Sequence, residues 1–298
     1  MFRVERLGRV FDPLRCSSGL THGSNALALS VDGDTVEIIF NQRDCHNRSV
    51  VSRAWLDMAK FAVLDVESSI LVPGPEHVGS EMGLSLGNVV TIEGRDLLSL
   101  MGWSKSARHP WVGSLCAVDL DSLDSIPCPP FITDIGSGPP APLLSCSYPF
   151  IEVVSPGELR LLFGGTSSWS DDGSMRHSLY QLSGSTLSSI GFGIPQRVNF
   201  QDGFMRGFLV ARPWLSLSGA RELFFSAREK KNPNYSIYSG VFDGDAIRDL
   251  EITLSGSGKG WDSDMACYGS TFVCRGESFL LYSGNGYGVT GFGVASLN

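Results

Sequence analysis

Five glycines recur along the chain at a nearly constant spacing. They are Gly33, Gly94, Gly157, Gly219 and Gly276, which lie 61, 63, 62 and 57 residues apart. Each stands between two apolar segments, where a glycine allows the positive φ of a tight hairpin turn. Six or seven residues after each glycine, an apolar residue ends the second segment: Phe40, Met101, Phe163, Phe225 and Tyr282. Repeats of this length are typical of propellers and other arrays.

Each repeat predicts a strand, a turn, a second strand, a loop and a third strand. Five such repeats in 298 residues predict an all-β fold, namely a five-bladed β-propeller of antiparallel four-stranded blades. We expect one domain over residues 1–298, with blades near 20–70, 78–125, 140–190, 203–250 and 260–298. The alternative is a β-sandwich with coincidental spacing. Two independent landmarks that agree in all five repeats favour the propeller.

The last repeat shows only three strands before the chain stops at Asn298, whereas a propeller blade usually has four. Residues 1–19 precede the first blade, and Phe2–Leu7 could supply the missing outer strand and close the ring. The alternative is a frayed terminus that adds no strand.

The composition restricts the class of partner. A net charge of −8 argues against a nucleic-acid partner, and the absence of an 18-residue apolar run argues against a membrane span. Residues 1–20 lack the apolar core of a signal peptide. Seven cysteines without CxxC pairs predict reduced thiols and a cytoplasmic location. We expect no cofactor and no metal, because Asp44-Cys45-His46 alone is weak evidence for a metal site.

The order of the strands assigns the loops to the two ends of the ring. The starts of first strands and the loops after second strands share one end, opposite the hairpin glycines. These loops contain eight Lys or Arg and four acidic residues, a balance of +4 on a chain of −8. A basic mouth on an acidic body favours an anionic ligand, unless these are only solvated surface charges. Trp103 and Trp169 in the same loops suit the C–H faces of sugar rings.

Three carboxylates are the candidate catalytic groups at this end. Glu81 and Asp264 lie near the starts of the first strands of blades 2 and 5, and Asp44 follows the second strand of blade 1. These blades are contiguous around the ring, so the three side chains could converge. Glycosidic chemistry uses two carboxylates, one ionised and one held protonated by its surroundings. The alternative is that these acids only bind hydroxyls or brace Arg43, Arg212 and Arg228.

Several motifs resemble the five-bladed β-propeller glycosidase superfamily, which includes glycoside hydrolase families 32, 43 and 130. The most similar branch is bacterial and often associated with surface-polysaccharide loci. The resemblance covers nearly the whole chain. It rests on Thr21-His22 with Asn25, Phe40-Asn-Gln-Arg43-Asp44, Ala211-Arg212-Pro213-Trp214, Phe225-Ser-Ala-Arg228, Gly260-Trp261-Asp262-Ser-Asp264-Met265 with Tyr268, and Tyr282-Ser-Gly-Asn285-Gly-Tyr-Gly288 with Gly291-Phe-Gly-Val-Ala295.

The resemblance implies a carbohydrate ligand, bound by residues within these motifs. With the two tryptophans of the basic loops, the expected substrate-binding set is His22, Asn25, Arg43, Trp103, Trp169, Arg212, Arg228, Trp261, Asp262, Tyr268 and Asn285.

The chain departs from the pattern of that superfamily where acids are expected. Blade 2 opens with Ser80-Glu81 in place of paired aspartates, and Gly207-Phe208 stands where a glutamate precedes the Arg-Pro of blade 4. Blade 5 has Tyr268-Gly269 in place of Tyr-Pro, and blade 3 opens with Ser145-Cys-Ser-Tyr-Pro149 and offers no acid. A standard inverting hydrolase is therefore not the expectation.

Two functions remain open. The first is a carbohydrate-active enzyme that makes or breaks a glycosidic bond, inclined toward transfer or phosphorolysis of a phosphorylated sugar. In it Arg43, Arg212 and Arg228 would hold the anion as planar forks. The second is a glycan-binding propeller without turnover, which the missing acids of blades 3 and 4 favour.

Overall fold

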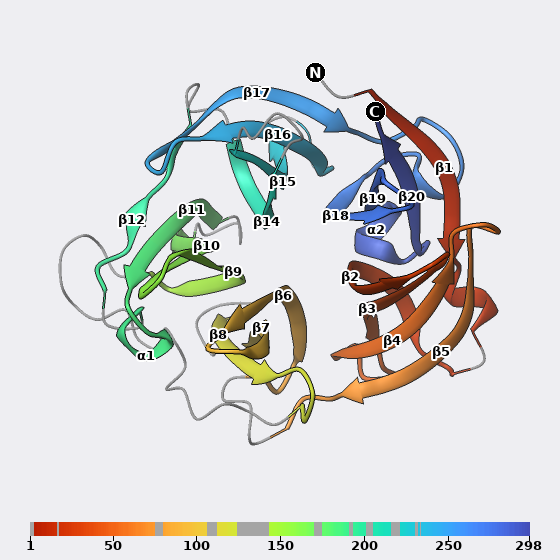
Figure 1. Cartoon of the computed structure of the whole chain (residues 1–298), viewed down its shortest axis with the longest axis horizontal. Helices are drawn as coiled ribbons and strands as arrows, with labels where there is room; N and C mark the ends of the chain where they lie inside the picture. The colour runs from red at the N-terminus through yellow and green to blue at the C-terminus, as the bar shows by residue number, and fades with distance from the viewer. Residues whose placement is uncertain are drawn as a thin grey trace.

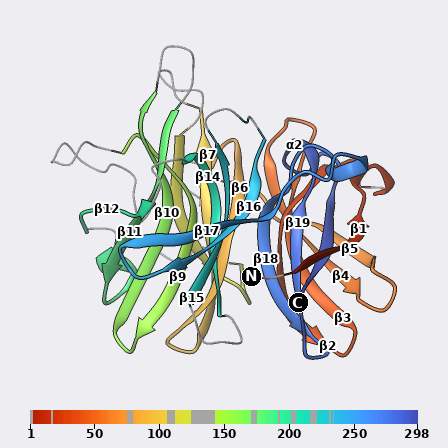
Figure 2. The ribbon, with the colours of Figure 1, turned by 90° about the horizontal axis from the view of Figure 1, so that it is seen from above.

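The computed structural model is an all-β ring built from antiparallel sheets (Figure 1). It describes residues 3–16, 18–74, 80–105, 112–123, 143–169, 175–190, 193–200, 205–215, 221–229, 232 and 234–298. The strands form antiparallel units, each named here after its first strand. Viewed from the side, most of these strands run along the short axis of the ring, whereas some outer strands run across it (Figure 2).

Three units come from the first two thirds of the chain. The β2 unit is β2 (Thr21–Asp32), β3 (Thr35–Arg43), β4 (Ser49–Asp57) and β5 (Ala62–Leu71). The β6 unit is β6 (Gly83–Ile92), β7 (Arg95–Ser104) and β8 (Val112–Asp119). The β9 unit is β9 (Ser145–Ser155), β10 (Glu158–Trp169), β11 (Met175–Gly184) and β12 (Gln196–Arg197). A single parallel pair, Ser49 with Gly83, joins the first two units into one seven-stranded sheet.

Two units complete the ring. The β14 unit is β14 (Met205–Leu215), β15 (Arg221–Glu229), β16 (Ser236–Phe242) and β17 (Ala246–Leu254), with β13 (Asn199–Phe200) parallel to β17. The β18 unit is β18 (Cys267–Cys274), β19 (Glu277–Ser283), β20 (Phe292–Leu297) and β1 (Val4–Phe11). The described short helices are η1 (Pro13–Arg15), α1 (Leu187–Ile190), η2 (Gly260–Asp262) and α2 (Asn285–Gly288).

Consecutive units contact one another through their first strands, and β18 contacts β2, so the ring is closed. A sandwich of two sheets is therefore the wrong alternative. No helix within the described residues is long and apolar enough to cross a membrane.

The hairpin turns fall where the glycine repeat predicts them. Gly33, Gly94, Gly157 and Gly276 have φ of 57°, 75°, 78° and 77°, in the left-handed region that glycine adopts without strain. Each lies in the turn between the first and second strand of its unit. Gly219 lies outside the described residues.

The N-terminal segment closes the last unit. Val4 pairs with Leu297 and Phe11 with Phe292, so β1 is the outer strand beside β20, the arrangement that the sequence left open, and it extends beyond the Phe2–Leu7 segment considered there. Arg3 and Asn298 exchange two backbone hydrogen bonds, of 2.8 and 3.0 Å. Both chain ends therefore stabilise one sheet, and their neighbouring positions are visible in Figure 1.

The hydrophobic core is divided among the interfaces between units. One cluster joins the β18 and β2 units, where the rings of Phe11 and Phe292 stack at 5.1 Å and Phe40 meets Phe11 at 4.8 Å. Further clusters join β2 to β6, β6 to β9, β9 to β14 and β14 to β18. Successive residues of a second strand thus serve opposite faces: Phe224 belongs to one cluster and Phe225 to the next. This explains the almost continuous apolar runs of the second strands.

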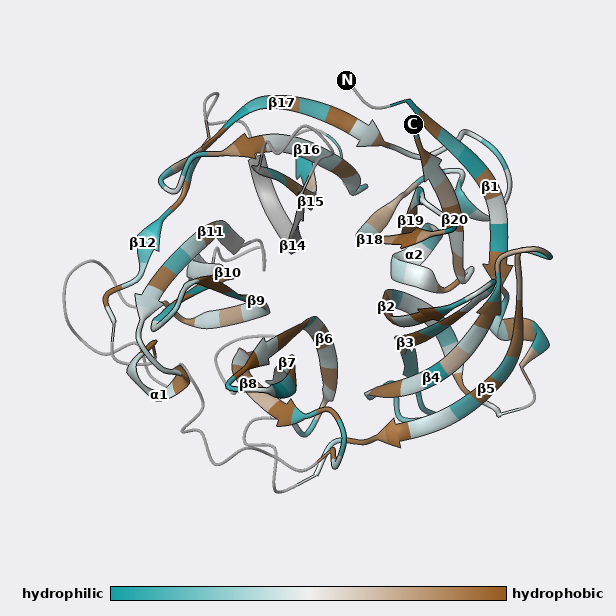
Figure 3. Ribbon diagram, viewed as in Figure 1, coloured by the Kyte–Doolittle hydropathy of each residue, from teal (hydrophilic) through white to brown (hydrophobic). Residues whose placement is uncertain are grey.

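The outer strands have a different character. In β5 and β17 most positions are half-buried or exposed and few are buried, and Figure 3 shows hydrophilic residues along β1 and β17. Their sequences therefore lack the apolar runs that identify the inner strands.

Candidate functional site

The first strand of every unit is interrupted at the same place. Against its second strand, each shows a register shift, which marks a β-bulge or similar irregularity. The shifts fall at Ser24/Leu27 in β2, Leu86/Val89 in β6, Ser147/Phe150 in β9, Phe208/Ala211 in β14 and Cys267/Ser270 in β18. A bulge redirects side chains, so residues here leave the strict alternation of a strand.

Three of these interruptions place a non-glycine residue in the left-handed region. Asn25, Tyr148 and Tyr268 have φ of 55°, 47° and 58°. Such residues are uncommon and cluster at functional sites. Although they belong to different units, Tyr148 and Tyr268 meet: their hydroxyl oxygens are 2.9 Å apart and their ring centroids 5.6 Å apart.

Around these bulges lies a cavity of about 210 Å³ that opens to solvent. Its described lining is hydroxyl, amide and aromatic: Ser24, Asn25, Asn41, Arg43, Ser49, Ser85, Met101, Trp103, Ser147, Tyr148, His177, Tyr235, Tyr268 and Tyr287. We call this the tyrosine pocket. Most of its residues come from the starts of first strands and the ends of second strands, the end of the ring that the topology predicts. Ser49 and His177 come from the starts of third strands, Tyr235 directly precedes β16, and Tyr287 lies in α2. Among these lining residues there is no carboxylate.

Two arginines at the tyrosine pocket have no acidic partner among the residues that the structure describes. The guanidinium of Arg43 lies 5.8 Å from the ring centre of Trp103 and donates to Asn47 Oδ1 at 2.9 Å. That of Arg228 lies 5.5 Å from the ring centre of Tyr235. Neither forms an ion pair with a described residue, whereas Arg48 pairs with Asp44 at 2.8 Å.

The electrostatics connect both arginines to the tyrosines. Burial raises the pKa of Tyr287, while the positive charges of Arg228 and Arg43 oppose the rise. Burial raises the pKa of Tyr148 to about 12, with Arg43 again opposing. Burial also raises the pKa of the other two pocket tyrosines, Tyr235 and Tyr268. All four therefore stay protonated at neutral pH and keep their hydroxyl donors.

His22 stands beside Arg43 and outside the pocket lining. Burial, and then the charge of Arg43, lower the pKa of His22 from 6.5 to about 4. Its Nδ1 lies 2.9 Å from the hydroxyl of Thr21. The imidazole is therefore neutral at neutral pH and adds no charge to the mouth of the pocket.

The three predicted catalytic carboxylates do not line the tyrosine pocket. Asp44 accepts the backbone N–H groups of His46 and Arg48 at 2.9 and 2.8 Å, and Arg48 Nε at 2.8 Å. Desolvation acts to raise the pKa of Asp44, but the hydrogen bonds from Arg48 and His46 outweigh it and lower the pKa. Asp264 and Glu81 are exposed at the surface. The convergence expected of the three is not present at the pocket.

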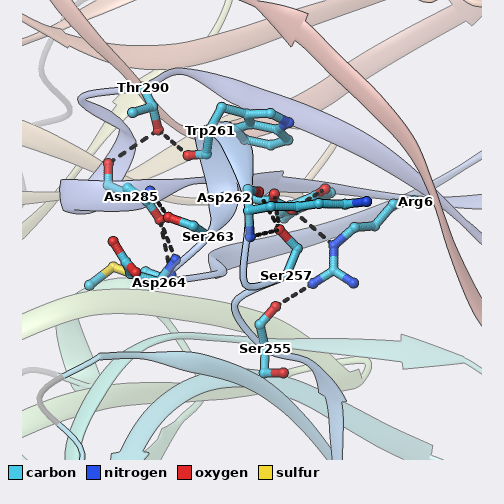
Figure 4. A network of polar contacts seen from close by, with 12 residues as sticks. Arg6, Ser255, Ser257, Trp261, Asp262, Ser263, Asp264, Asn285 and Thr290 are labelled. Atoms are coloured by element: carbon cyan, nitrogen blue, oxygen red, sulfur yellow. Dashed lines mark hydrogen bonds and ion pairs between the residues drawn. The ribbon is translucent and has the colours of Figure 1, made fainter.

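The Gly260–Met265 motif forms a set of contacts around Asp262, which we call the clasp (Figure 4). This aspartate is 3% exposed. It accepts hydrogen bonds from Arg6 Nε at 2.9 Å, the Tyr282 hydroxyl at 3.0 Å and Ser257 Oγ at 2.7 Å. Arg6 also donates to the carbonyl oxygen of Ser255. Asp262 therefore connects β1 to the other strands of the β18 unit, which is a structural role.

Trp261 and Asn285 belong to the same clasp. The indole of Trp261 packs on Tyr282, with ring centres 5.2 Å apart. Asn285 Oδ1 accepts the backbone N–H groups of Asp264 and Met265 at 2.8 and 3.1 Å, and its Nδ2 donates to Ser263 (Figure 4). None of these side chains lines the tyrosine pocket.

The predicted binding set thus separates into groups. Asn25, Arg43, Trp103 and Tyr268 line the pocket, and Arg228 reaches it through Tyr235. His22, Trp261, Asp262 and Asn285 lie outside its lining. The side chains of Trp169 and Arg212 lie outside the described part of the chain.

The structure adds pocket residues that the binding set did not include. Tyr148, Ser147, Tyr235, Tyr287 and His177 all line the cavity. One signal was available for Tyr148: it precedes Gly157 by nine residues, much as Tyr268 precedes Gly276 by eight.

Comparisons with known proteins agree with this fold. No family model matches the chain. It is 28% identical over 305 residues to an uncharacterized protein of Mycobacterium tuberculosis, with 98% of each chain covered. It is similar to the structure of a glycosyl hydrolase from Bacteroides ovatus, with a TM-score of 0.66 and 12% identity over 99% of this chain and 93% of the other.

Two further structures show the same likeness. One is from the GH130 family of mannoside phosphorylases and glycoside hydrolases, with a TM-score of 0.60 and 14% identity over 99% and 93% of the chains. The other is a GH32 β-fructofuranosidase of Bombyx mori, with a TM-score of 0.57 and 10% identity over 97% and 61%. The structural neighbours are thus glycoside hydrolase-like propeller proteins, as the sequence motifs predict.

Proposed function

We propose that the protein binds a carbohydrate that carries an anionic group, in the tyrosine pocket of a five-bladed propeller. The blade count follows from treating the single Ser49–Gly83 pair as a junction between blades. It is supported by hydrophobic clusters at each of the interfaces between consecutive units.

The observation that carries the proposal is the pair of arginines that form no ion pair with any described acidic residue. Arg43 lines the tyrosine pocket, and Arg228 lies against the ring of Tyr235, another lining residue, so both charges lie close to one cavity. The planar guanidinium group is suited to phosphate or carboxylate, which it can bind through two parallel hydrogen bonds. Within the described part of this acidic chain the two guanidinium groups have no anionic partner, and an anionic group on a ligand would supply one.

The remaining lining suits the sugar itself. Aromatic faces accommodate C–H surfaces, and hydroxyl and amide groups match sugar hydroxyls. Trp103, Tyr268 and Tyr235 supply the rings, and Asn41, Ser49 and Ser85 supply polar atoms. We infer that a precursor of a bacterial surface polysaccharide, such as a sugar phosphate, fits this combination.

A second candidate function is glycosidic-bond transfer or phosphorolysis. It is favoured by a structural neighbour from a family described as mannoside phosphorylases, because two arginines could hold an attacking phosphate. In this alternative Asp44, Glu81 and Asp264 would move toward the pocket to act as acid and base. The lining described above gives recognition more support than turnover, since it contains no carboxylate.

Calorimetric titration tests the proposal with glucose 1-phosphate, mannose 1-phosphate and glucuronic acid, each against its neutral sugar. We expect the anionic forms to bind more tightly, and added salt to weaken them. Arg43→Ala and Arg228→Ala should each weaken binding about 10- to 100-fold, because a hydrogen bond to a charged group contributes about 1.5–3 kcal/mol. Arg95→Ala is the matched control, since Arg95 pairs with Asp119 away from the pocket. Equal affinity for charged and neutral sugars would overturn the anionic assignment.

A further inference from the structure

A serine, a histidine and a threonine form a hydrogen-bonded row in the wall of the tyrosine pocket. Ser147 Oγ lies 3.1 Å from His177 Nε2, and Thr166 Oγ1 lies 2.9 Å from His177 Nδ1. Ser147 is 1% exposed, His177 4% and Thr166 0%. Ser147 and His177 both line the cavity. The row is therefore buried in the fold and faces the space where a ligand would sit.

The sheet of the β9 unit fixes this arrangement. Thr166 on β10 is paired in register with His177 on β11, and Gly164 on β10 is paired with Ser147 on β9. A Cβ at position 164 would overlap both His177 Nε2 and Ser147 Oγ. Only glycine at this position lets serine and histidine meet across the middle strand.

The contacts assign a role to each group. With its proton on Nδ1, His177 donates to the Thr166 hydroxyl and presents the Nε2 lone pair to the Ser147 hydroxyl. A serine hydroxyl is a weak nucleophile until an adjacent base takes its proton, and that base is oriented by a third group. Ser147 Oγ also lies 3.5 Å from the carbonyl oxygen of Gly164, a weaker alternative acceptor. Thr166 is thus a positioning residue.

The described pocket residues next to this row are neutral or cationic. Tyr148 follows Ser147 directly, and Arg43 acts on Tyr148 from the β2 unit. Donor hydroxyls and a guanidinium in one cavity are suited to negative charge that develops on a carbonyl oxygen. By contrast, the described lining lacks the carboxylate pair that glycosidic cleavage uses. The chemistry available in the pocket is therefore attack by serine oxygen.

We propose that Ser147 is a nucleophile activated by His177, and that it acts on a carboxylic ester such as an O-acyl group on the bound sugar. The sugar part of this proposal rests on the proposed function. Ser147 Oγ bonds to the acyl carbon while its proton passes to His177 Nε2. The ester C–O bond breaks, and the leaving sugar oxygen takes the proton from His177. Water then attacks the acyl-serine by the same route, so that ester and water give acid and alcohol.

The test is covalent labelling of the full chain by a fluorophosphonate probe, located by mass spectrometry. We expect the adduct on Ser147. Ser147→Ala should abolish it, and His177→Gln should slow it by about 10²–10⁴-fold, the usual contribution of a general base. Thr166→Val should slow it less, and the pH profile of labelling should shift because the imidazole loses its orienting partner. Ser239→Ala is the matched control: Ser239 is a buried serine of β16 outside the pocket, and this variant should label at the wild-type rate.

Thermal unfolding of each variant shows whether it is folded, and Ser147→Cys gives a second readout. The thiol at position 147 should alkylate with iodoacetamide faster when His177 is present than in Ser147→Cys/His177→Gln. An unlabelled Ser147 in the folded wild type, or labelling that His177→Gln leaves unchanged, would overturn the proposal. Labelling of Ser147 without any sugar binding would support the nucleophile and overturn the carbohydrate assignment alone. Sugar binding without labelling of Ser147 would support the carbohydrate assignment and overturn the nucleophile.

Discussion

Asn88 and Ile151 exchange two hydrogen bonds between neighbouring units: Asn88 Nδ2 donates to the Ile151 carbonyl oxygen at 2.7 Å, and the Ile151 N–H donates to Asn88 Oδ1 at 2.8 Å. Asn88 lies at the bulge of β6, and Ile151 lies just after the bulge of β9. A bulge leaves backbone groups without a ladder partner, and buried backbone groups must be satisfied. The asparagine amide supplies both missing partners at once.

Other units are connected in the same way. Asn25 Nδ2 donates to the Leu86 carbonyl oxygen at 2.6 Å, and the Leu86 N–H donates to Asn41 Oδ1 at 3.0 Å. The Tyr268 N–H donates to Ser226 Oγ at 2.8 Å. The irregular strands that direct side chains into the tyrosine pocket are thus held by polar side chains of the adjacent unit. Asn25, expected as a sugar ligand, already uses its amide for this purpose.

Asn88→Ala tests this connection. It would leave both the N–H and the carbonyl oxygen of Ile151 buried without a partner. Each such group costs about 1–3 kcal/mol, so we expect the free energy of unfolding to fall by about 2–5 kcal/mol in urea titrations. Asn298→Ala, at an exposed residue whose backbone pairing is kept, should change it by less than about 0.5 kcal/mol. Equal effects of the two substitutions would refute the role of Asn88.

The clasp around Asp262 gives a second prediction. Asp262→Ala removes the acceptor of Arg6, Tyr282 and Ser257 and leaves a guanidinium facing a buried space. We expect a loss of about 3–5 kcal/mol in the free energy of unfolding, the range for breaking a buried pair. The loss from Arg6→Ala should be smaller, because a third of the Arg6 side chain is exposed.

Hydrogen exchange would locate the effect of the clasp. Both substitutions should increase exchange of the β1 and β20 amides before those of the β9 unit. Arg3→Ala is the control, since Arg3 bonds to Asn298 through backbone atoms. Uniform loss of protection around the whole ring would contradict a local clasp.

His22 predicts a pH dependence of stability. Its pKa is about 4 in the folded chain, against an ordinary value of 6.5 for an exposed imidazole, so the unfolded chain binds this proton first as the pH falls. The free energy of unfolding that His22 contributes is therefore fully present above pH 6.5 and declines between pH 6.5 and 4. In urea titrations at several pH values across that range, His22→Gln should remove this part of the dependence of the free energy of unfolding on pH. A variant that keeps the wild-type slope would show that other groups cause it.

Much of the ring is predictable from local sequence. The four described hairpin glycines have positive φ. The second strands are buried on both faces and therefore carry apolar runs, and each begins one or two residues after its repeat glycine. The outer strands β5 and β17 were not predicted, because most of their positions are half-buried or exposed and their sequences carry no long apolar run. The closing strand β1 could be inferred only because the last repeat has three strands where a blade usually has four.

The candidate site is less predictable for two physical reasons. Bulges break the alternation on which side-chain direction is inferred, so Tyr148 and Ser147 could not be assigned to the cavity from the strand pattern. Ion pairs also depend on contacts remote in sequence: Asp262 meets Arg6 at a separation of 256 residues. From the sequence alone, an acidic residue that forms a structural ion pair cannot be told from one that binds sugar, because its partner is not known.

Asp44 separates the two candidate functions. In the structure its carboxylate braces the turn after β3 through His46 and Arg48. Asp44→Asn keeps one acceptor oxygen but places an N–H₂ group near Arg48 Nε. We expect the free energy of unfolding to fall by about 1 kcal/mol, because the pair with Arg48 is partly exposed. Affinity for the anionic sugar should change by less than about threefold, since Arg43 keeps its contact with Trp103.

The same carboxylate predicts how this effect varies with pH. Its pKa is lowered in the folded chain, so the stability it adds is present above the unfolded value of 3.8 and is lost as the pH falls through the folded value. The difference between wild type and Asp44→Asn should therefore be constant near neutral pH and shrink in acid. If Asp44 were instead an acid or base for a glycosidic bond, Asp44→Asn would leave binding intact and reduce turnover of a glycoside or sugar phosphate by about 10²–10⁴-fold. A loss of turnover of this size would show that the pocket catalyses glycosidic chemistry and does not only bind the sugar.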